Sequence, residues 1–325
     1  MAWRFKLAPD NTKIDFFRWQ WITFGGSLFL SVLSVVAWAV MGLNYGIDFK
    51  GGTTLRTEST VAVDVGAYRE ALQGLPLGDI SITEVFDPNF TDDQHVTMIR
   101  IAAEDETLAV TPEQITQVEE VLRAAIDPEM KFPSVETVGP KVSGELVWTS
   151  VLSLIVTSVA IMIYMWLRFE WQFGVGAVLA LLHDVIITIG IFAVFQIKFD
   201  LTIVAALLTI LGYPINDTVV VFDRLRENLQ KYKQMPLREV MNLSVNETLA
   251  RTLMTSVTTL LAVGAMLVFG GDVLRGFSLA IFIGVLFGTY SSIYVAKNIV
   301  LIIGLDRSEK AKKSGTPDEF ANVDA

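Results

Sequence analysis

Six long apolar segments constrain this chain more than any other feature of its sequence. Each is close to the roughly 20 residues that an α-helix needs to cross the hydrocarbon core of a bilayer. They are Trp21–Leu43, Leu146–Leu167, Phe173–Phe195, Leu201–Phe222, Thr252–Phe269 and Phe277–Gly304. Hydrophobic residues make up 52% of the chain, more than a soluble domain usually holds. The sequence therefore predicts an α-helical polytopic membrane protein with six transmembrane helices, the first of them an uncleaved anchor.

Lysine and arginine are distributed unevenly between the segments that connect these spans. Residues 1–20, the connector 223–251 and the tail 305–325 are rich in them, whereas the alternate loops hold only Lys198 and Arg275. Because cytoplasmic loops are enriched in these residues, both termini and the connector are predicted to be cytoplasmic. Residues 44–145, which hold 19 acidic and 7 basic side chains, then form an outer domain. The net charge of −10 arises there and does not indicate nucleic-acid binding.

The outer domain alternates between strand and helix patterns. Strands are predicted at Thr53–Thr60, Ile80–Phe86, His95–Ile101 and Phe132–Val138, and helices at Asp64–Leu72 and Thr111–Ala125. Asp64 and Thr111 are typical N-cap residues, and proline at position 112 favours a helix start. The order β-α-β-β-α-β predicts a ferredoxin-like α+β domain.

Asp217 lies near the cytoplasmic end of the fourth span, between Asn216 and Thr218. An ionised carboxylate inside a bilayer is costly unless it is paired, hydrated or protonated, so such a residue indicates function. The alternative is a structural aspartate that a neighbouring helix satisfies. Pro214 precedes it and removes one backbone donor, which predicts a kinked or opened turn before the acid.

Other ionisable residues lie in or beside the spans. His183 and Asp184 fall in the third span, and Arg251 opens the fifth at a depth that permits pairing with Asp217. Carboxylate, imidazole and guanidinium groups at similar depths are the components of a proton relay. The alternatives are interhelical hydrogen bonding by His183 and Asp184, and an Arg251 side chain that reaches the lipid headgroups.

The connector 223–251 begins as a charged continuation of the fourth span. Its polar motif comprises Asp223, Arg224, Arg226, Glu227 and Asn228. Residues 237–250 are amphipathic, which fits either a helix on the membrane surface or a solvated connector. The chain has no cysteine and only two histidines, so no metal site, cofactor site or thiol nucleophile is predicted.

Several motifs in this order resemble the SecF side of the SecD/SecF family of bacterial protein-export proteins. They are GIDFKGG at 46–52, VGPKVSG at 138–144, LHD at 182–184, INDTVVVFDRLREN at 215–228 and NETLART at 246–252. The resemblance covers about residues 14–304. Pro214 departs from it, since serine is usual there.

The resemblance implies a fold related to the RND transporters, with six helices that join six from SecD, in the bacterial inner membrane. It implies use of the proton-motive force to promote late steps of preprotein passage through SecYEG, after SecA has begun export, and release on the periplasmic side. It assigns the proton-pathway acid to Asp217 and the intramembrane arginine to Arg251. A hinge at Asp48, Phe49, Gly51 and Gly52 would join the membrane and periplasmic domains, although a simple turn fits equally.

Three other functions fit some of these residues. One half of an RND-type small-molecule exporter and a passive scaffold for SecD are the alternatives, although scaffolding does not require buried ionisable groups. An intramembrane aspartyl protease would use Asp184 and Asp217, but the sequence motifs of such proteases are absent. The chain is therefore expected to be a transport subunit and not an enzyme.

Overall fold

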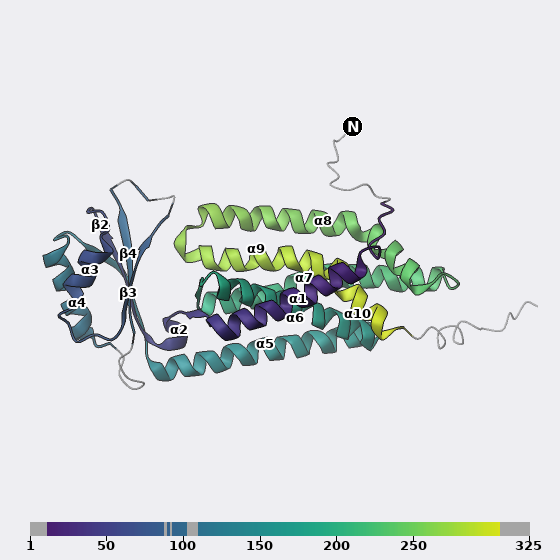
Figure 1. Ribbon diagram of the computed structural model, residues 1–325, viewed down its shortest axis with the longest axis horizontal. Coiled ribbons are helices and arrows are strands. Elements are labelled where there is room, and N and C mark those ends of the chain that lie inside the picture. The colour runs from purple at the N-terminus through teal and green to yellow at the C-terminus, as the bar shows by residue number, and fades with distance from the viewer. Residues whose placement is uncertain (1–11, 88–89, 92, 103–109, 306–325) are drawn as a thin grey trace, which may run out of the picture.

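The computed structural model describes residues 12–87, 90–91, 93–102 and 110–305, and within them it contains six membrane-length helical spans (Figure 1). These spans confirm the six predicted from the sequence. They are α1 (Gln20–Met41), α5 (Pro140–Arg168), α6 (Trp171–Val194), α7 (Leu201–Lys231), α8 (Leu237–Phe269) and the pair α9 (Gly271–Tyr294) and α10 (Ala296–Ile303). The helices lie side by side, with the β-sheet at one end of the bundle.

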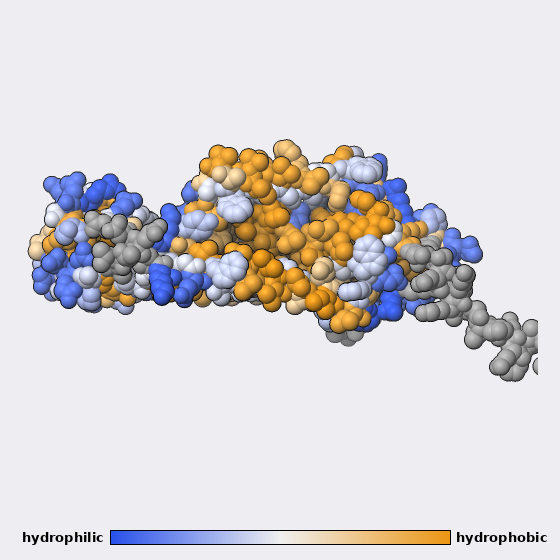
Figure 2. Space-filling view, turned by 90° about the horizontal axis from the view of Figure 1, so that it is seen from below, coloured by the Kyte–Doolittle hydropathy of each residue, from blue (hydrophilic) through white to orange (hydrophobic). Residues whose placement is uncertain are grey.

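The surface of the bundle is apolar between two hydrophilic ends (Figure 2). Large apolar side chains are exposed along α1 and α5, including Trp21 at 76% and Leu167 at 82% of their accessible surface. By contrast, α6 and α7 bury most of one face inside the bundle. A helix bundle with an apolar surface of this extent is expected to lie in lipid, because lipid tails solvate apolar side chains.

The α+β domain is built on a four-stranded antiparallel sheet. Its elements are β2 (Gly52–Ser59), α3 (Val65–Leu72), β3 (Ile80–Val85), β4 (His95–Ile101), α4 (Pro112–Ala125) and β5 (Lys131–Val138). The strands are arranged in the order β3-β4-β2-β5. Leu55 and Ile99 face each other across the sheet and pack with Val118 and Leu122 of α4, so both helices cover one face.

Local signals set the helix starts in this domain. The Asp64 carboxylate accepts hydrogen bonds from the backbone N–H groups of residues 66 and 67. Thr111 and Gln114 form a reciprocal capping box, with Pro112 in the first turn. Each arrangement satisfies backbone donors that a helix start leaves unpaired, which explains why sequence patterns located both helices closely.

The membrane bundle differs from the prediction in three places. First, α7 runs through Pro214 without a break, so the predicted opened turn is wrong. Second, residues 237–250 are the first part of α8 and bury Val240, Met241 and Val245 in the bundle, so they are neither a surface helix nor a solvated connector. Third, the last span is interrupted at Val295.

A short junction joins the sheet to the membrane helices. Strand β1 (Asn44–Tyr45) pairs in parallel with β6 (Lys198–Phe199), just before α7. Helix α2 (Ile47–Lys50) follows β1 and leads into β2 through two glycines. None of these short elements was predicted, because two to four residues carry no usable periodicity.

Candidate functional site

His183 and Asp184 form a buried polar cluster between α6, α1 and α9. The His183 ring contacts Asp184 Oδ1 through Nδ1 at 2.8 Å and Ser27 Oγ through Nε2 at 2.9 Å. The other carboxylate oxygen of Asp184 accepts a hydrogen bond from Ser291 Oγ at 2.6 Å. Asp184 has no exposed surface, so these contacts replace the solvation that a buried carboxylate loses.

A close approach of α1 to α6 brings Ser27 to the histidine. Two helical turns further along both helices, a Cβ added at Gly190 would lie 2.3 Å from Cβ of Ser34. Only glycine fits at that crossing, and the short distance between the helices leaves Ser27 within reach of His183. Ser27 was not singled out in the sequence, because nothing local distinguishes one serine in an apolar span from another.

Asp217 is bound by hydroxyl groups of α8. Thr255 Oγ1 donates to Asp217 Oδ1 at 3.1 Å, with Oδ2 at 3.4 Å, and Ser256 lies beside the same carboxylate. Tyr213, one turn earlier on α7, donates to the backbone oxygen of Thr255 at 2.9 Å. Asp217 is 3% exposed, so α7 and α8 enclose the acid between them.

The predicted ion pair between Asp217 and Arg251 is not formed among the described residues. Arg251 is exposed, and it lies near enough to act on Asp217 by charge without direct contact. Asn216 is also exposed and points away from the polar interior. Thr218 contacts Ser292 Oγ of α9 at 2.9 Å, so it faces α9 while Asp217 faces α8.

The charged motif at the end of α7 binds the first part of α8. Arg224 Nε donates to Glu247 Oε2 at 2.7 Å, and Asn228 Nδ2 donates to the same oxygen at 2.6 Å. Arg224 also pairs with Glu227, and Asp223 contacts Arg168 at the end of α5. This network fixes the register of α7 against α8 two turns from Asp217. Arg226 is half-buried on the same helix.

The predicted hinge residues divide into an anchor and a turn. Asp48 accepts a hydrogen bond from Leu201 N at 2.9 Å, which ties α2 to the start of α7, and Phe49 packs on Phe199. Gly51 and Gly52 have φ angles of 75° and 123°. A Cβ at Gly52 would lie 2.4 Å from the backbone oxygen of residue 101, so this turn requires glycine.

Arg100 of β4 also reaches the junction. Its Nη1 donates to Tyr45 O at 3.4 Å, while its Nε is buried and has no hydrogen-bond partner in the part of the chain that the structure describes. Burial lowers the pKa of the Arg100 guanidinium, and the nearby carboxylates of Asp200 and Asp48 partly oppose this. Arg100 therefore links β4 of the sheet to β1 of the junction, near the start of α7.

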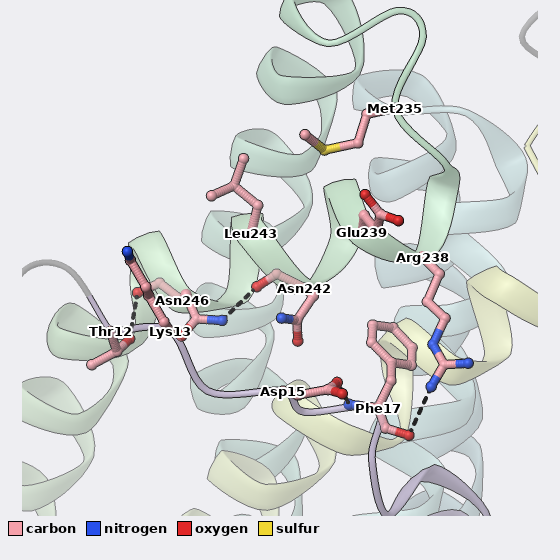
Figure 3. Close-up of a pocket in the computed structure, with 10 residues that line it drawn as sticks. All are labelled: Thr12, Lys13, Asp15, Phe17, Met235, Arg238, Glu239, Asn242, Leu243 and Asn246. Atoms are coloured by element: carbon pink, nitrogen blue, oxygen red, sulfur yellow. Dashed lines mark hydrogen bonds between the residues drawn. The ribbon is translucent and has the colours of Figure 1, made fainter.

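The segment before α1 is held against α8 and α10 (Figure 3). Asn246 pairs with both backbone groups of Ile14, and Asn242 Oδ1 accepts from Phe16 N at 2.9 Å. Lys297 of α10 is 1% exposed; its Nζ donates to Phe16 O at 3.1 Å and lies 3.9 Å from the Phe17 ring centroid. A hollow of about 580 Å³ remains beside this segment, lined by residues that include Lys13, Asp15 and Arg238.

Lys297 is a residue that sequence reasoning missed although a signal was present. It is the one charged side chain in the predicted span Phe277–Gly304.

No group of three or more potential metal ligands occurs within the part of the chain that the structure describes.

Comparisons with known proteins place this architecture. A family model described as protein export membrane protein SecD/SecF, C-terminal, matches residues 117–306, and a SecD/SecF GG motif model matches residues 36–63. The first match contains His183, Asp184, Asp217 and Arg251. The chain belongs to the SecD/SecF family of protein-export membrane proteins.

Relatives within the SecD/SecF family cover the whole chain. Protein translocase subunit SecF of Cereibacter sphaeroides is 65% identical over 325 residues, which is 100% of both chains. The subunit of the same name from Rhodobacter capsulatus is 62% identical over 327 residues, with 99% of this chain and 98% of the relative covered. That of Rickettsia bellii is 37% identical over 305 residues, with 94% and 98% covered.

Solved SecDF structures share the fold. The crystal structure of SecDF, a translocon-associated membrane protein from Thermus thermophilus, superposes with a TM-score of 0.80 at 36% identity. A structure of SecDF in a super-membrane-facing form gives a TM-score of 0.66 at 35% identity. The matches cover 91% and 95% of this chain but only 39% and 40% of those chains, so this chain spans about two fifths of their length.

Proposed function

We propose that this chain is the SecF subunit of a bacterial protein translocase and that it acts together with SecD. In this proposal the pair uses the proton-motive force to promote late passage of preproteins through SecYEG, after SecA has begun their export. The observation that carries the proposal is Asp217: a SecD/SecF family chain keeps a carboxylate buried between two membrane helices, and within the described residues its hydrogen-bond partners are hydroxyl groups.

The contacts of Asp217 suggest how a proton is used. A hydroxyl donor satisfies part of a carboxylate, but it leaves an ionised one without a counter-charge in the bilayer. A protonated Asp217 therefore suits the enclosed arrangement with Thr255. Loss of the proton creates a charge that attracts Arg251, which lies one helical turn from Thr255 on α8. We infer that movement of Arg251 toward Asp217 accompanies deprotonation and shifts α8 against α7.

The cytoplasmic network of Arg224, Asn228 and Glu247 makes that shift consequential. This network fixes the cytoplasmic end of α7 against the first part of α8. A change at Asp217 is therefore transmitted toward the opposite ends of the two helices. There α7 begins at the anchor formed by Asp48. The turn at Gly51 and Gly52 then acts as the pivot between the anchored α2 and the sheet.

The proposal includes a topology. Residues 44–145 form a periplasmic domain of the ferredoxin-like class, which the β-α-β-β-α-β element order and the strand order β3-β4-β2-β5 support. Both termini lie in the cytoplasm and the protein lies in the inner membrane, which the distribution of lysine and arginine supports. Reporter fusions after Ala125 and after Lys233 are expected to report opposite compartments.

The alternatives make different demands on the chain. A small-molecule exporter half needs a deep substrate pocket in its outer domain, and a passive scaffold needs no buried acids. A protease needs two carboxylates that share one proton. Here Asp184 and Asp217 have separate partners on different helices. The relatives are named translocase subunits, which is a transport role.

Two experiments test the proposal in sequence. Co-purification with SecD from membranes is expected, and failure to recover SecD would contradict the assignment as its partner. Replacement of the host SecF by this chain should then restore proton-gradient-dependent export of a preprotein. A chain that binds SecD but restores no gradient-dependent export would instead be a scaffold.

A further inference from the structure

One turn of α9 carries three hydroxyl groups that contact three different helices. Thr289 Oγ1 donates to Ser256 Oγ of α8 at 2.6 Å, and Ser291 Oγ donates to Asp184 Oδ2 of α6 at 2.6 Å. Ser292 Oγ meets Thr218 Oγ1 of α7 at 2.9 Å. Successive residues on a helix project about 100° apart, so these positions necessarily face different neighbours. The turn therefore stands between the surroundings of Asp184 and those of Asp217.

Two glycines allow α9 to approach this closely. A Cβ at Gly288 would lie 2.5 Å from Pro214 Cγ and 3.4 Å from Asp184 Oδ2. A Cβ at Gly284 would lie 2.3 Å from Ile210 Cγ1. Neither position has room for a side chain unless α7 moves. The close packing places the Pro214 ring and the Asp184 carboxylate against the same turn of α9.

Each of the three hydroxyls also has a backbone oxygen of α9 within reach, which for Ser292 is Gly288 O at 2.8 Å. Ser291 Oγ lies 3.2 Å from Gly288 O as well as 2.6 Å from Asp184. Thr289 Oγ1 lies 2.7 Å from Val285 O as well as 2.6 Å from Ser256. A hydroxyl carries one proton and donates to one acceptor at a time. Each can therefore turn from its side-chain partner to its own helix when that partner becomes a donor.

We propose that the turn 288–292 of α9 links Asp184 to Asp217, so that the protonation of one acid changes that of the other. Thr289 and Ser291 are the positioning residues of this link, and Ser27 extends it through His183 to α1. The proposal deepens the proton step assigned to Asp217 and rests on that proposed function. It adds residues of α1, α8 and α9 to a site predicted from α6, α7 and Arg251.

The link works through hydrogen-bond direction. When Asp184 is ionised, Ser291 donates to it. When Asp184 holds a proton on Oδ2, that proton needs an acceptor, and Ser291 must turn its own proton to Gly288 O. Ser256 and Thr289 are subject to the same choice beside Asp217. A change at one acid therefore alters the contacts of α9 and the packing that α9 offers to the other acid.

Within the described residues, the charged or titratable groups near the two acids include Tyr213, whose hydroxyl donates to the backbone oxygen of Thr255. His183 lies beside Asp184, and Arg251 acts on Asp217 from the exposed side of α8. The residues that face the acids from α1 and α9 contribute hydroxyls. Among the described residues, the route between the two acids through α9 runs over the hydroxyls of Ser291 and Thr289.

The test measures the protonation of Asp184 directly, in the complex with SecD in lipid. Infrared difference spectra over a pH series record carboxylic-acid C=O bands, and the band lost in Asp184→Asn belongs to this residue. Asp217→Asn is expected to shift the titration midpoint of that band by about one pH unit, the size at which two sites titrate as a pair. When Thr289→Val or Ser291→Ala is already present, the addition of Asp217→Asn is expected to leave the titration midpoint of the Asp184 band unchanged.

Matched variants separate this role from packing. Thr289→Ser keeps the hydroxyl and should keep the shift. Ser278→Ala removes a fully buried hydroxyl of α9 that has no hydrogen-bond partner among the described residues, and it should also keep the shift. If Ser291→Ala fails to assemble with SecD, the Thr289→Val and Thr289→Ser pair decides alone.

Two results would overturn the proposal: no shift on Asp217→Asn in otherwise unchanged protein, or a full shift in Thr289→Val. Export is measured on the same samples. Export that needs Asp217 without any shift would remove the link and keep the proposed function. A shift without gradient-dependent export would keep the link and remove that function.

Discussion

Thr255 of α8 donates its hydroxyl to Asp217 of α7, with the two carboxylate oxygens at 3.1 and 3.4 Å. The same hydroxyl lies 2.9 Å from the backbone oxygen of Thr252 and 3.2 Å from that of Arg251. Its single proton can therefore serve the acid or its own helix. Thr255 can therefore exchange its hydrogen bond to Asp217 for one to its own helix. A contact between α7 and α8 that depends on protonation requires such an exchange.

Removal of this hydroxyl should weaken the proton step. Thr255→Val keeps the shape of the side chain and removes its donor. A hydrogen bond between neutral groups contributes about 0.5–1.5 kcal/mol, so gradient-dependent export should fall about two- to tenfold. Thr255→Ser keeps the donor and should retain most of the activity. Equal activity in both variants would show that the hydroxyl has no role.

Replacement of Lys297 should loosen the segment before α1. Lys297→Ala removes a buried stem, the hydrogen bond to Phe16 O and the contacts with aromatic rings. We expect a net loss of about 2 kcal/mol, because these losses exceed the relieved cost of burying an ammonium. Lys297→Met keeps the stem and should lose less. Thermal unfolding in detergent measures this, with the exposed Lys13→Ala as the control that should not change.

Two glycine-to-alanine substitutions should differ in sign. Gly288→Ala places a methyl group 2.5 Å from Pro214 Cγ, and the overpacking should cost about 1–3 kcal/mol. Gly212→Ala meets nothing within 4 Å and should be neutral or stabilise α7 by up to about 1 kcal/mol. Unfolding temperatures of the two variants, measured side by side, are the readout. A stable Gly288→Ala protein would mean that α9 does not need this close approach.

Asp127 should make the stability of the α+β domain depend on pH. Its carboxylate accepts hydrogen bonds from Ser59 Oγ at 2.7 Å, from Glu129 N at 2.9 Å and from both N and Oγ1 of Thr60. These bonds, that from Ser59 foremost, hold the pKa of Asp127 below its ordinary value. The stabilisation is then present above the unfolded pKa of about 3.9 and is lost as the pH falls through the lower folded value.

The corresponding variant is Asp127→Asn. It should be less stable than the unchanged protein at pH 7, and the difference should shrink as the pH falls below about 4. Hydrogen exchange of amides in β2 at several pH values follows this domain within the full chain. A stability difference that is constant with pH would contradict the assignment.

The sequence predicted those parts of the fold that depend on local signals. The helix that begins after Thr111 and ends at Ala125 has its cap, its proline and its apolar period within 15 residues. In the strand His95–Ile101, burial alternates from Thr97 onward, with Thr97, Ile99 and Ile101 on the buried face. The six spans follow from length and apolar content alone.

The prediction failed where distant helices decide the outcome. Residues 237–250 have one apolar face, and its packing with Phe16, Phe17 and Phe222 excludes both a surface helix and a solvated connector. Pro214 breaks many helices, yet Gly288 accommodates its ring and α7 continues.

The candidate site was predicted in part for the same reason. Asp217, His183 and Asp184 stand out as ionisable residues in apolar spans. Thr255, Ser27 and Ser291 do not, because a hydroxyl is acceptable on any helix face and its partner is set by tertiary packing. The pairing of Asp217 with Arg251 assumed that similar depth implies contact, whereas the structure places Arg251 on the exposed side of α8.

The most direct test of the account is proton-gradient-dependent export in membranes whose only SecF is the Asp217→Asn variant. Asparagine keeps the size of the side chain and an acceptor for Thr255, but it cannot titrate. Protein level and SecD binding are measured in parallel, and Asp223→Asn near the charged end of α7 serves as the matched control. The account predicts normal level and SecD binding, loss of the gradient-dependent part of export, and near-normal export in the control. Full gradient-dependent export by Asp217→Asn would contradict it and leave Asp217 a structural residue.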